Sequence, residues 1–262
     1  TLNTVLFSPE DLFLIKGAPA ERRRFLDGEI SQASPAYYHE LATYQRLVAQ
    51  RNALLKRIRE RRAAPAALAP WEPQLAASAA RVTAKRLEVV RKLGMLANLM
   101  QRRISGSQEN LALSLVIDGS GGEAPPTVTN ALETWYNEKL QECRENDIAR
   151  GATTVGPHRD DRMLAVNGVN LRSFGSQGQQ RTGALSLKLS ELEFLRSETG
   201  EYPILLLDDV MSELDADRRQ ALLAFLRKEH IQTIITATDA AYFPRAPRGT
   251  RYRVAAGQVA RL

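Results

Sequence analysis

The fold of this chain is decided by the stretch Pro203-Ile204-Leu205-Leu206-Leu207-Asp208-Asp209-Val210-Met211-Ser212-Glu213-Leu214-Asp215. Its apolar run ends in paired acids, a pattern typical of a buried strand that presents carboxylates at its C-terminal end. Ligands of open α/β sheets bind at that edge. Asp208 is therefore a candidate Mg²⁺ ligand, directly or through water, and Asp209 a candidate for orienting or deprotonating a nucleophilic water. The alternative is that both acids cap the next helix.

A turn rich in Gly, Ser and Gln lies one helix upstream of this strand. It reads Phe174-Gly175-Ser176-Gln177-Gly178-Gln179-Gln180-Arg181-Thr182 and leads into a leucine-rich helical pattern. Free backbone N–H groups at a helix start, together with a serine hydroxyl, form a cradle for an anion. A plain capped turn is the alternative interpretation.

The composition is that of a soluble globular protein, with 262 residues, 44% of them hydrophobic and 25% charged. It excludes a disordered or collagen-like chain. The apolar runs are far shorter than the ~20 residues of a membrane helix, so we expect no membrane partner. Cys143 is the single cysteine and no signal peptide is visible, which together favour a reducing, cytoplasmic location.

Three zones follow one another along the chain: 1–27 with a strand and a polar segment, 28–150 mostly helical, and 151–262 with an α/β pattern. Within the second zone, two stretches with apolar steps of three and four predict an antiparallel helical hairpin joined by the Ala- and Pro-rich segment 63–74. If Ile58 faces Ala79, Arg51 lies opposite Arg86. Two like charges in one layer repel, so we expect both arginines to extend into solvent, with contact to an anion as the alternative.

Positive charge is concentrated in this hairpin. Residues 51–62 hold six basic side chains and one acidic one, and residues 81–103 hold seven and one. The net charge of the whole chain is only +6. This bias favours contact with a phosphate backbone, the alternative being an ordinary solvated helix face.

The chain resembles the C-terminal half of an ABC-type ATPase head in the order of four features. These are the Ser176 turn, its helix, the strand with Asp208 and Asp209, and segment 212–215. More narrowly, the chain resembles the RecF family of bacterial recombination mediators, which is related to the SMC ATPases. Segments 7–12, 21–27 and 156–161 also carry the resemblance. It implies an α/β fold: the C-terminal half of an ABC-type P-loop ATPase head with an inserted, mostly helical arm. On this basis 1–27 ends one ATPase lobe, 28–150 is the arm, and 151–262 is the signature and Walker B part.

The resemblance also implies roles for single residues. The signature sequence, which binds ATP across a dimer interface, would be Ser176, Gln177, Gly178 and Gln179. Asp208 would be the Walker B ligand of Mg²⁺, and Asp209 the catalytic base where many ABC proteins carry Glu, which suits slow hydrolysis. Ser212 and Asp215 would belong to the D-loop at the dimer interface. No switch histidine stands near Thr238, so a threonine is expected to replace it. The resemblance assigns no role to His158, which we expect to be a structural residue of its loop.

One motif of the family is missing from this sequence. No Gly-x-x-x-x-Gly-Lys-[Ser/Thr] occurs, and the glycines of 119–122 lack the lysine. We therefore expect a chain without its N-terminal P-loop lobe, which alone neither binds nor hydrolyses ATP, whereas the complete protein is a slow ABC-type ATPase.

The function implied by the resemblance is ATP-dependent DNA binding in recombinational repair and replication-fork restart. The protein would form a homodimer on ATP binding, engage double-stranded DNA near single-strand/duplex junctions, and load recombinase at gaps together with RecO and RecR. Two alternatives remain. One is a non-catalytic fragment that binds DNA or a partner protein. The other is a transporter-type ATPase subunit, which the missing switch histidine and the basic helical insertion disfavour.

Overall fold

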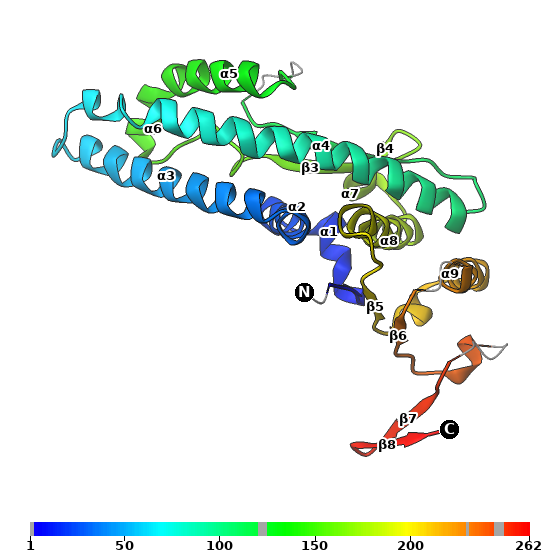
Figure 1. Cartoon of the computed structure of the whole chain (residues 1–262). Helices are drawn as coiled ribbons and strands as arrows, with labels where there is room; N and C mark the ends of the chain where they lie inside the picture. Colours follow the sequence, from blue (N-terminus) through cyan, green and yellow to red (C-terminus); the bar gives the residue numbers. More distant parts are fainter. Residues whose placement is uncertain (1–2, 120–124, 229–230, 244–248) are drawn as a thin grey trace.

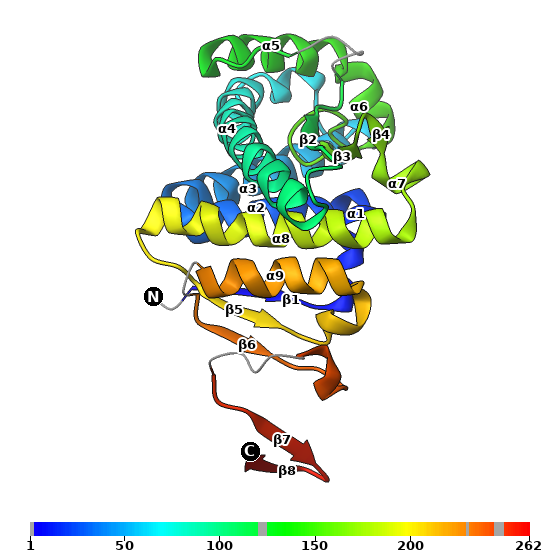
Figure 2. The ribbon, with the colours of Figure 1, turned by 90° about the vertical axis from the view of Figure 1, so that its right-hand side faces the viewer.

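The computed structural model describes residues 3–119, 125–228, 231–243 and 249–262. Its centre is a parallel sheet in the order β1-β5-β6, made of β1 (Thr4–Phe7), β5 (Ile204–Leu207) and β6 (Thr233–Ile235). All three strands run the same way, so their carboxyl ends meet at one edge (Figure 2). The buried strand predicted to end at the paired acids is β5.

Helices cover one face of this sheet. α8 (Gln177–Thr199) and α9 (Ala216–Lys228) lie above the strands in Figure 2. The side chains of Val5 and Leu205 point to that face and are at most 2% exposed. On the other face, Leu6 is 50% exposed, because alternate residues of a strand point to opposite sides.

Two short elements follow β1, namely the 3-10 helix Pro9–Leu12 and α1 (Phe13–Lys16). α2 (Pro19–Ala33) comes next and crosses the predicted boundary between 27 and 28. A proline at the start of this helix fits its position, since a first-turn residue has no partner for its N–H.

The predicted helical hairpin is present as α3 (Pro35–Arg59) and α4 (Glu72–Ile104) (Figure 1). α4 is the longest helix among the described residues, and its second half packs on α8 and on a second sheet. α5 (Thr129–Glu142) packs on α4, and α6 (Arg144–Arg150) packs on α3. Of the glycines in 119–122, Gly121 and Gly122 lie outside the described residues.

The second sheet is antiparallel and joins the arm to the head. It contains β2 (Leu111–Val116), β3 (Asp161–Val166) and β4 (Val169–Asn170), followed by α7 (Leu171–Phe174). β2 belongs to the predicted arm and β3 to the predicted third zone, so pairing crosses the boundary drawn at 150. The described chain ends in a hairpin of β7 (Tyr252–Ala255) and β8 (Gln258–Arg261).

The register predicted for the hairpin is wrong. Arg51 lies beside Glu72, not beside Arg86, and the Arg86 side chain lies beside Tyr37. The cause is the connection between the helices. It contains a 3-10 helix, Pro65–Leu68, and folds back along the end of α3 so that Leu68 is buried. The pairing of α3 with α4 therefore starts several turns before the tip.

The expectation that Arg51 and Arg86 extend into solvent is also wrong. Their exposures are 0% and 2%. Arg51 donates to Asp147 at 2.6 Å, to the Thr153 hydroxyl at 2.9 Å and to Glu72 at 3.1 Å. Arg86 donates through Nε and Nη2 to Asp27 at 2.9 Å and through Nη1 to the carbonyl oxygen of Pro157 at 2.6 Å. Each arginine meets an anion, and in both cases the protein itself supplies it.

Within the described part of the chain, no helix has both the length and the apolar character that crossing a bilayer requires.

Candidate functional site

The site is built at the carboxyl edge of the parallel sheet, where Asp208 directly follows β5. Its backbone N–H donates to the carbonyl oxygen of Phe7 at 2.9 Å, which holds it beside β1. Its Oδ1 accepts a hydrogen bond of 2.6 Å from the hydroxyl of Thr236, which follows β6. The side chain is exposed, and its second oxygen has no partner among the described residues. Asp208 thus has one carboxylate oxygen exposed and unpaired at the sheet edge.

Asp209 adopts an unusual backbone conformation. Its φ of 48° lies in the left-handed region, which a residue other than glycine rarely occupies. Its N–H donates to the Thr236 hydroxyl at 3.0 Å, and its Oδ1 is buried without a hydrogen-bond partner. An unpartnered buried carboxylate oxygen is costly unless a ligand or water meets it. Strain and an unsatisfied oxygen at one residue are both typical of functional sites.

Thr236 therefore links the two acids through one hydroxyl, donating to Asp208 and accepting from Asp209. A threonine near Thr238 was expected to replace the switch histidine, but the link from Thr236 to both acids was not predicted. The available signal was that Thr236 directly follows an apolar strand, because such a residue reaches the same sheet edge as Asp208.

The donor set at this edge fits Mg²⁺. Among the described residues, no group of three or more His, Cys, Asp or Glu side chains gathers to hold a metal. Mg²⁺ binds through one or two carboxylates and completes its shell with water and phosphate oxygens. Asp208 and Asp209 offer two carboxylates of that kind, each with an oxygen that the protein leaves unpaired.

The turn predicted to cradle an anion opens α8, with Ser176 as its N-cap. The Ser176 hydroxyl accepts from the N–H of Gln179 at 3.2 Å, and the Gln179 side chain accepts from the N–H of Ser176 at 3.1 Å. This reciprocal capping box leaves the amides of Gln177 and Gly178 without partners in the described chain. Ser176 and Gln177 are exposed, whereas Gly178 and Gln179 are half-buried. The turn is both capped and open to an anion.

The segment after Asp209 forms a 3-10 helix, Val210–Glu213, and then the start of α9. Ser212 donates through its hydroxyl to the carbonyl oxygen of Asp209 at 2.8 Å. Asp215 accepts from the N–H of Arg218 at 2.9 Å and pairs with its guanidinium at 3.0 Å, so it caps α9. Capping of the next helix was the alternative role for Asp208 and Asp209. In the structure Asp215 caps that helix.

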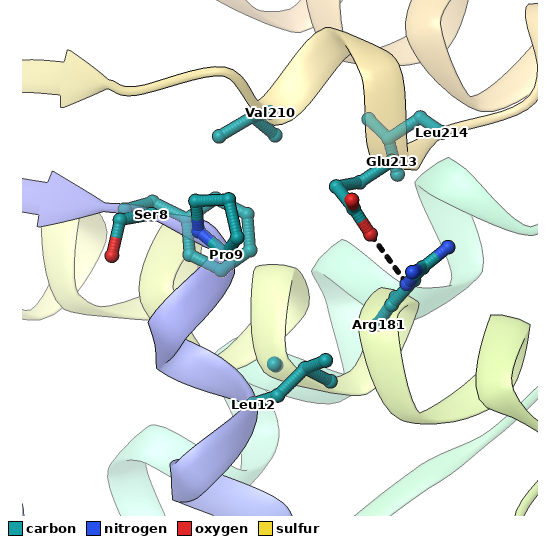
Figure 3. Close-up of a pocket in the computed structure, with 9 residues that line it drawn as sticks. Ser8, Pro9, Leu12, Arg181, Val210, Glu213 and Leu214 are labelled. Carbon is teal, nitrogen blue, oxygen red and sulfur yellow. Dashed lines mark ion pairs between the residues drawn. The ribbon is translucent and has the colours of Figure 1, made fainter.

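An ion pair that the sequence did not reveal ties the two halves of the site together. Arg181 on α8 pairs with Glu213 at 2.5 Å (Figure 3). A small pocket lies beside this pair, between the end of β1 and the 3-10 helix, with Ser8, Pro9 and Val210 in its wall. Nothing in the local pattern of Arg181 marks it as a partner, because Glu213 is distant in sequence.

The predicted residues thus form two groups at one end of the head (Figure 2). Asp208, Asp209 and Ser212 form the first group through Thr236 and the backbone. The turn at Ser176 is the second. In the described chain no hydrogen bond or ion pair joins Ser176, Gln177, Gly178 or Gln179 to the acids, and the Arg181–Glu213 pair is the link between the groups.

His158 lies away from this edge, inside the arm. Its Nδ1 lies 2.6 Å from the Tyr44 hydroxyl and its Nε2 lies 3.0 Å from the carbonyl oxygen of Thr153. Burial lowers the pKa of His158, which favours the neutral ring. Gly156 is required here, because its φ is 134° and an added Cβ would stand 2.3 Å from the Tyr44 oxygen.

Comparison with known proteins gives one consistent result. No family model matches the chain. A DNA replication and repair protein RecF from Heliobacterium modesticaldum is 49% identical over 263 residues, which cover 100% of this chain and 70% of the relative. The RecF of Bacillus subtilis is 45% identical over 241 residues, covering 91% and 64%.

Two solved structures agree with these relatives. The recombination mediator protein RecF with ATP, described as part of the RecFOR pathway, has a TM-score of 0.85 and 35% identity, covering 100% of this chain and 68% of its own. A second solved structure, that of RecF-ATPrS, has a TM-score of 0.84 and 36% identity with the same coverage. The chain thus spans about two thirds of the length of its relatives. The predicted fold, the C-terminal half of an ABC-type ATPase head with a helical arm, is confirmed. The chain belongs to the RecF family of DNA replication and repair proteins.

Proposed function

We propose that this chain supplies the signature and Walker B half of an ATP-controlled DNA-binding protein. The complete protein forms a homodimer on ATP, binds double-stranded DNA at junctions with single strands, and loads recombinase at gaps with RecO and RecR as partners. The observation that carries the proposal is the bridge from Thr236 to both acids at the sheet edge. Membership of the RecF family leaves the transporter alternative without support.

The proposed mechanism divides the chemistry between the two groups of the site. Mg²⁺, when bound, neutralises the charge of the ATP phosphates. Asp208, whose other oxygen is bound by Thr236, would hold the ion. Asp209 orients the attacking water, and its short side chain, held by a strained backbone, makes that step slow.

The turn at Ser176 serves the second copy. In the described chain, the backbone N–H groups of Gln177 and Gly178 have no partner at the positive, N-terminal end of α8. They can bind the terminal phosphate of a nucleotide that the other copy holds. The Arg181–Glu213 pair then connects phosphate binding on α8 with the D-loop. One nucleotide thereby stabilises the dimer, and its hydrolysis releases it.

Dimerisation can be tested in a chimera that adds, from the Heliobacterium modesticaldum relative, the part of its length that this chain does not span. Light scattering should show a monomer mass without nucleotide and a dimer mass with ATP and Mg²⁺. Ser176→Arg should abolish the dimer, because a large cation would occupy the phosphate cradle. Ser114→Arg, on another exposed serine, which lies in β2, is the matched control. A chimera that stays monomeric with ATP, or a Ser176→Arg variant that dimerises normally, refutes the proposal.

The second candidate function is a module that binds DNA without nucleotide control. It is favoured by the exposed cations at the end of α3. The affinity of the chimera for duplex DNA should then fall steeply with salt concentration and be the same with and without ATP. That result would favour this candidate over the first.

A further inference from the structure

A cluster of exposed cations lies at the free end of the hairpin, where α3 and α6 end. We call this region the arm tip; its cations are exposed and comprise Lys56, Arg57, Arg59, Arg61, Arg62 and Arg150. The acid among the tip residues 56–62 is Glu60, which pairs with Arg62 at 3.3 Å while both side chains stay largely exposed. The tip therefore carries a net charge of +5, close to the +6 of the whole chain.

Folding brings these cations together from two places in the sequence. The Arg59 guanidinium donates to the carbonyl oxygen of Arg150 at 3.1 Å, which attaches the end of α6 to the end of α3. Gly151 packs against Lys56 and Arg59 at the same junction. In Figure 1 this end of the hairpin points away from the β5 and β6 strands. The cluster is thus separate from the ATP site.

Five other cations of the hairpin are engaged by carboxylates of the protein. Arg51 and Arg86 are buried and bind carboxylates of the protein. Arg81, Lys85 and Lys92 each pair with a glutamate at 3.0 Å or less, and those glutamates are Glu40, Glu88 and Glu198. The basic side chains of the hairpin therefore include internal links along the arm, scattered exposed cations of α4 such as Arg91 and Arg102, and the cluster at the tip.

Arg61 occupies a position where glycine would be more stable. Its φ is 58°, and the hydrogen bonds from the N–H of Arg62 to Arg57 at 2.8 Å and from the N–H of Arg61 to Ile58 at 2.9 Å complete a Schellman motif. Glycine is the usual residue at this place, because a Cβ is strained in the left-handed region. The chain holds a cation there in spite of the strain.

We propose that the arm tip binds the phosphate backbone of duplex DNA. The inference rests on the proposed function, to which it adds a second DNA contact remote from the ATP site. The last turn of α3, residues 56–59, extends over about 6 Å, a length along which a duplex carries about three to four phosphate charges. The adjoining exposed residues Ala64, Pro65 and Ala66 are small, so a phosphate backbone can approach the cations closely.

The test measures the affinity of the chain for a fluorescein-labelled duplex by anisotropy at several salt concentrations. The tip variant combines Lys56→Ala, Arg57→Ala and Arg61→Ala. It should bind about tenfold more weakly at ~0.1 M salt, and the slope of log K against log salt should become shallower by about two to three. The control variant combines Arg91→Ala, Arg102→Ala and Arg227→Ala, which removes the same charge from exposed positions of α4 and α9. It should keep the wild-type slope.

A second pair of variants separates binding from stability. Arg61→Gly should raise Tm by about 2–4 °C, because the strain is relieved, and should still weaken DNA binding. Ser107→Gly relieves the same kind of strain after α4, where φ is 66°, and should leave DNA binding unchanged. Binding and stability moving in opposite directions at Arg61 cannot come from a merely structural role.

Three results would overturn the inference. They are a tip variant with the affinity and salt slope of the wild type, a control variant that loses as much as the tip variant, and Arg61→Gly with undiminished affinity. Each of these leaves the ATP-dependent dimer of the chimera untouched, so the failure of the tip is distinguishable from the failure of the proposed function. A wild-type chain that binds no duplex would overturn the tip and the DNA part of the proposed function together.

Discussion

Replacing Arg51 by alanine should lower the free energy of unfolding by about 3–5 kcal/mol. The Arg51 side chain is completely buried and joins α3 to α4 through Glu72 and to α6 through Asp147. Without Arg51, Asp147 keeps the two bonds that Thr154 donates to its Oδ1, at 2.9 and 2.6 Å, but its Oδ2 loses the partner at 2.6 Å. A buried carboxylate without its counterion accounts for the main part of the loss, and the cavity adds to it.

The loss can be measured by urea unfolding, followed by circular dichroism and by tryptophan fluorescence. One of the two tryptophans, Trp71, precedes Glu72 at the start of α4. Arg81→Ala is the matched control, because it removes an arginine of the same hairpin from an exposed pair with Glu40. That change should cost at most about 1 kcal/mol. Arg51→Met fills the space without the charge, so its combination with Asp147→Asn should recover part of the lost stability.

A loss below about 1 kcal/mol for Arg51→Ala, or one equal to that of Arg81→Ala, would refute the assignment of Arg51 as an internal link of the arm. Arg51 would then count among the cations that are available to bind a phosphate backbone. The salt dependence of DNA binding by Arg51→Ala then has to be measured as well.

Three further predictions concern other parts of the molecule. Burial raises the pKa of Asp160 to about 7, above its ordinary value of 3.8, so stability should fall as pH rises from about 4 to about 7. Asp160→Asn should flatten this slope in urea unfolding at a series of pH values, and an unchanged slope would contradict the assignment. Thr236→Val should slow ATP hydrolysis by the chimera about 10–100-fold, because both acids lose their shared partner. Thr236→Ser keeps the hydroxyl and should hydrolyse ATP at the wild-type rate. If Thr236→Val also hydrolyses ATP at the wild-type rate, the bridge has no role in catalysis. The 262-residue chain alone should show no tight ATP binding by calorimetric titration, and a submicromolar Kd would overturn the argument from the missing P-loop motif.

Local patterns were sufficient for the elements that carry the site. The apolar run before Asp208 predicts β5, because a strand buried in a parallel sheet is apolar throughout. The spacing of Ser176 and Gln179 is that of a helix start, and the capping box confirms the turn. These features depend on residues only a few positions apart, so the strand and the helix start can be predicted from the local sequence.

Packing decided the rest, because the deciding partners are distant along the chain. The hairpin register follows from the burial of Leu68 on the end of α3, which the apolar periodicity of two helices does not encode. Arg51 and Arg86 look like surface cations until Asp147 and Asp27 are brought to them from elsewhere in the sequence. Thr236 reaches the acids only because β6 pairs with β5 in parallel. A helical period shows which residues share a face of one helix. Which charges meet across the fold depends on how whole elements are placed. The physical reason is that a salt bridge acts over a few ångströms of space, whatever the separation of its partners in the sequence.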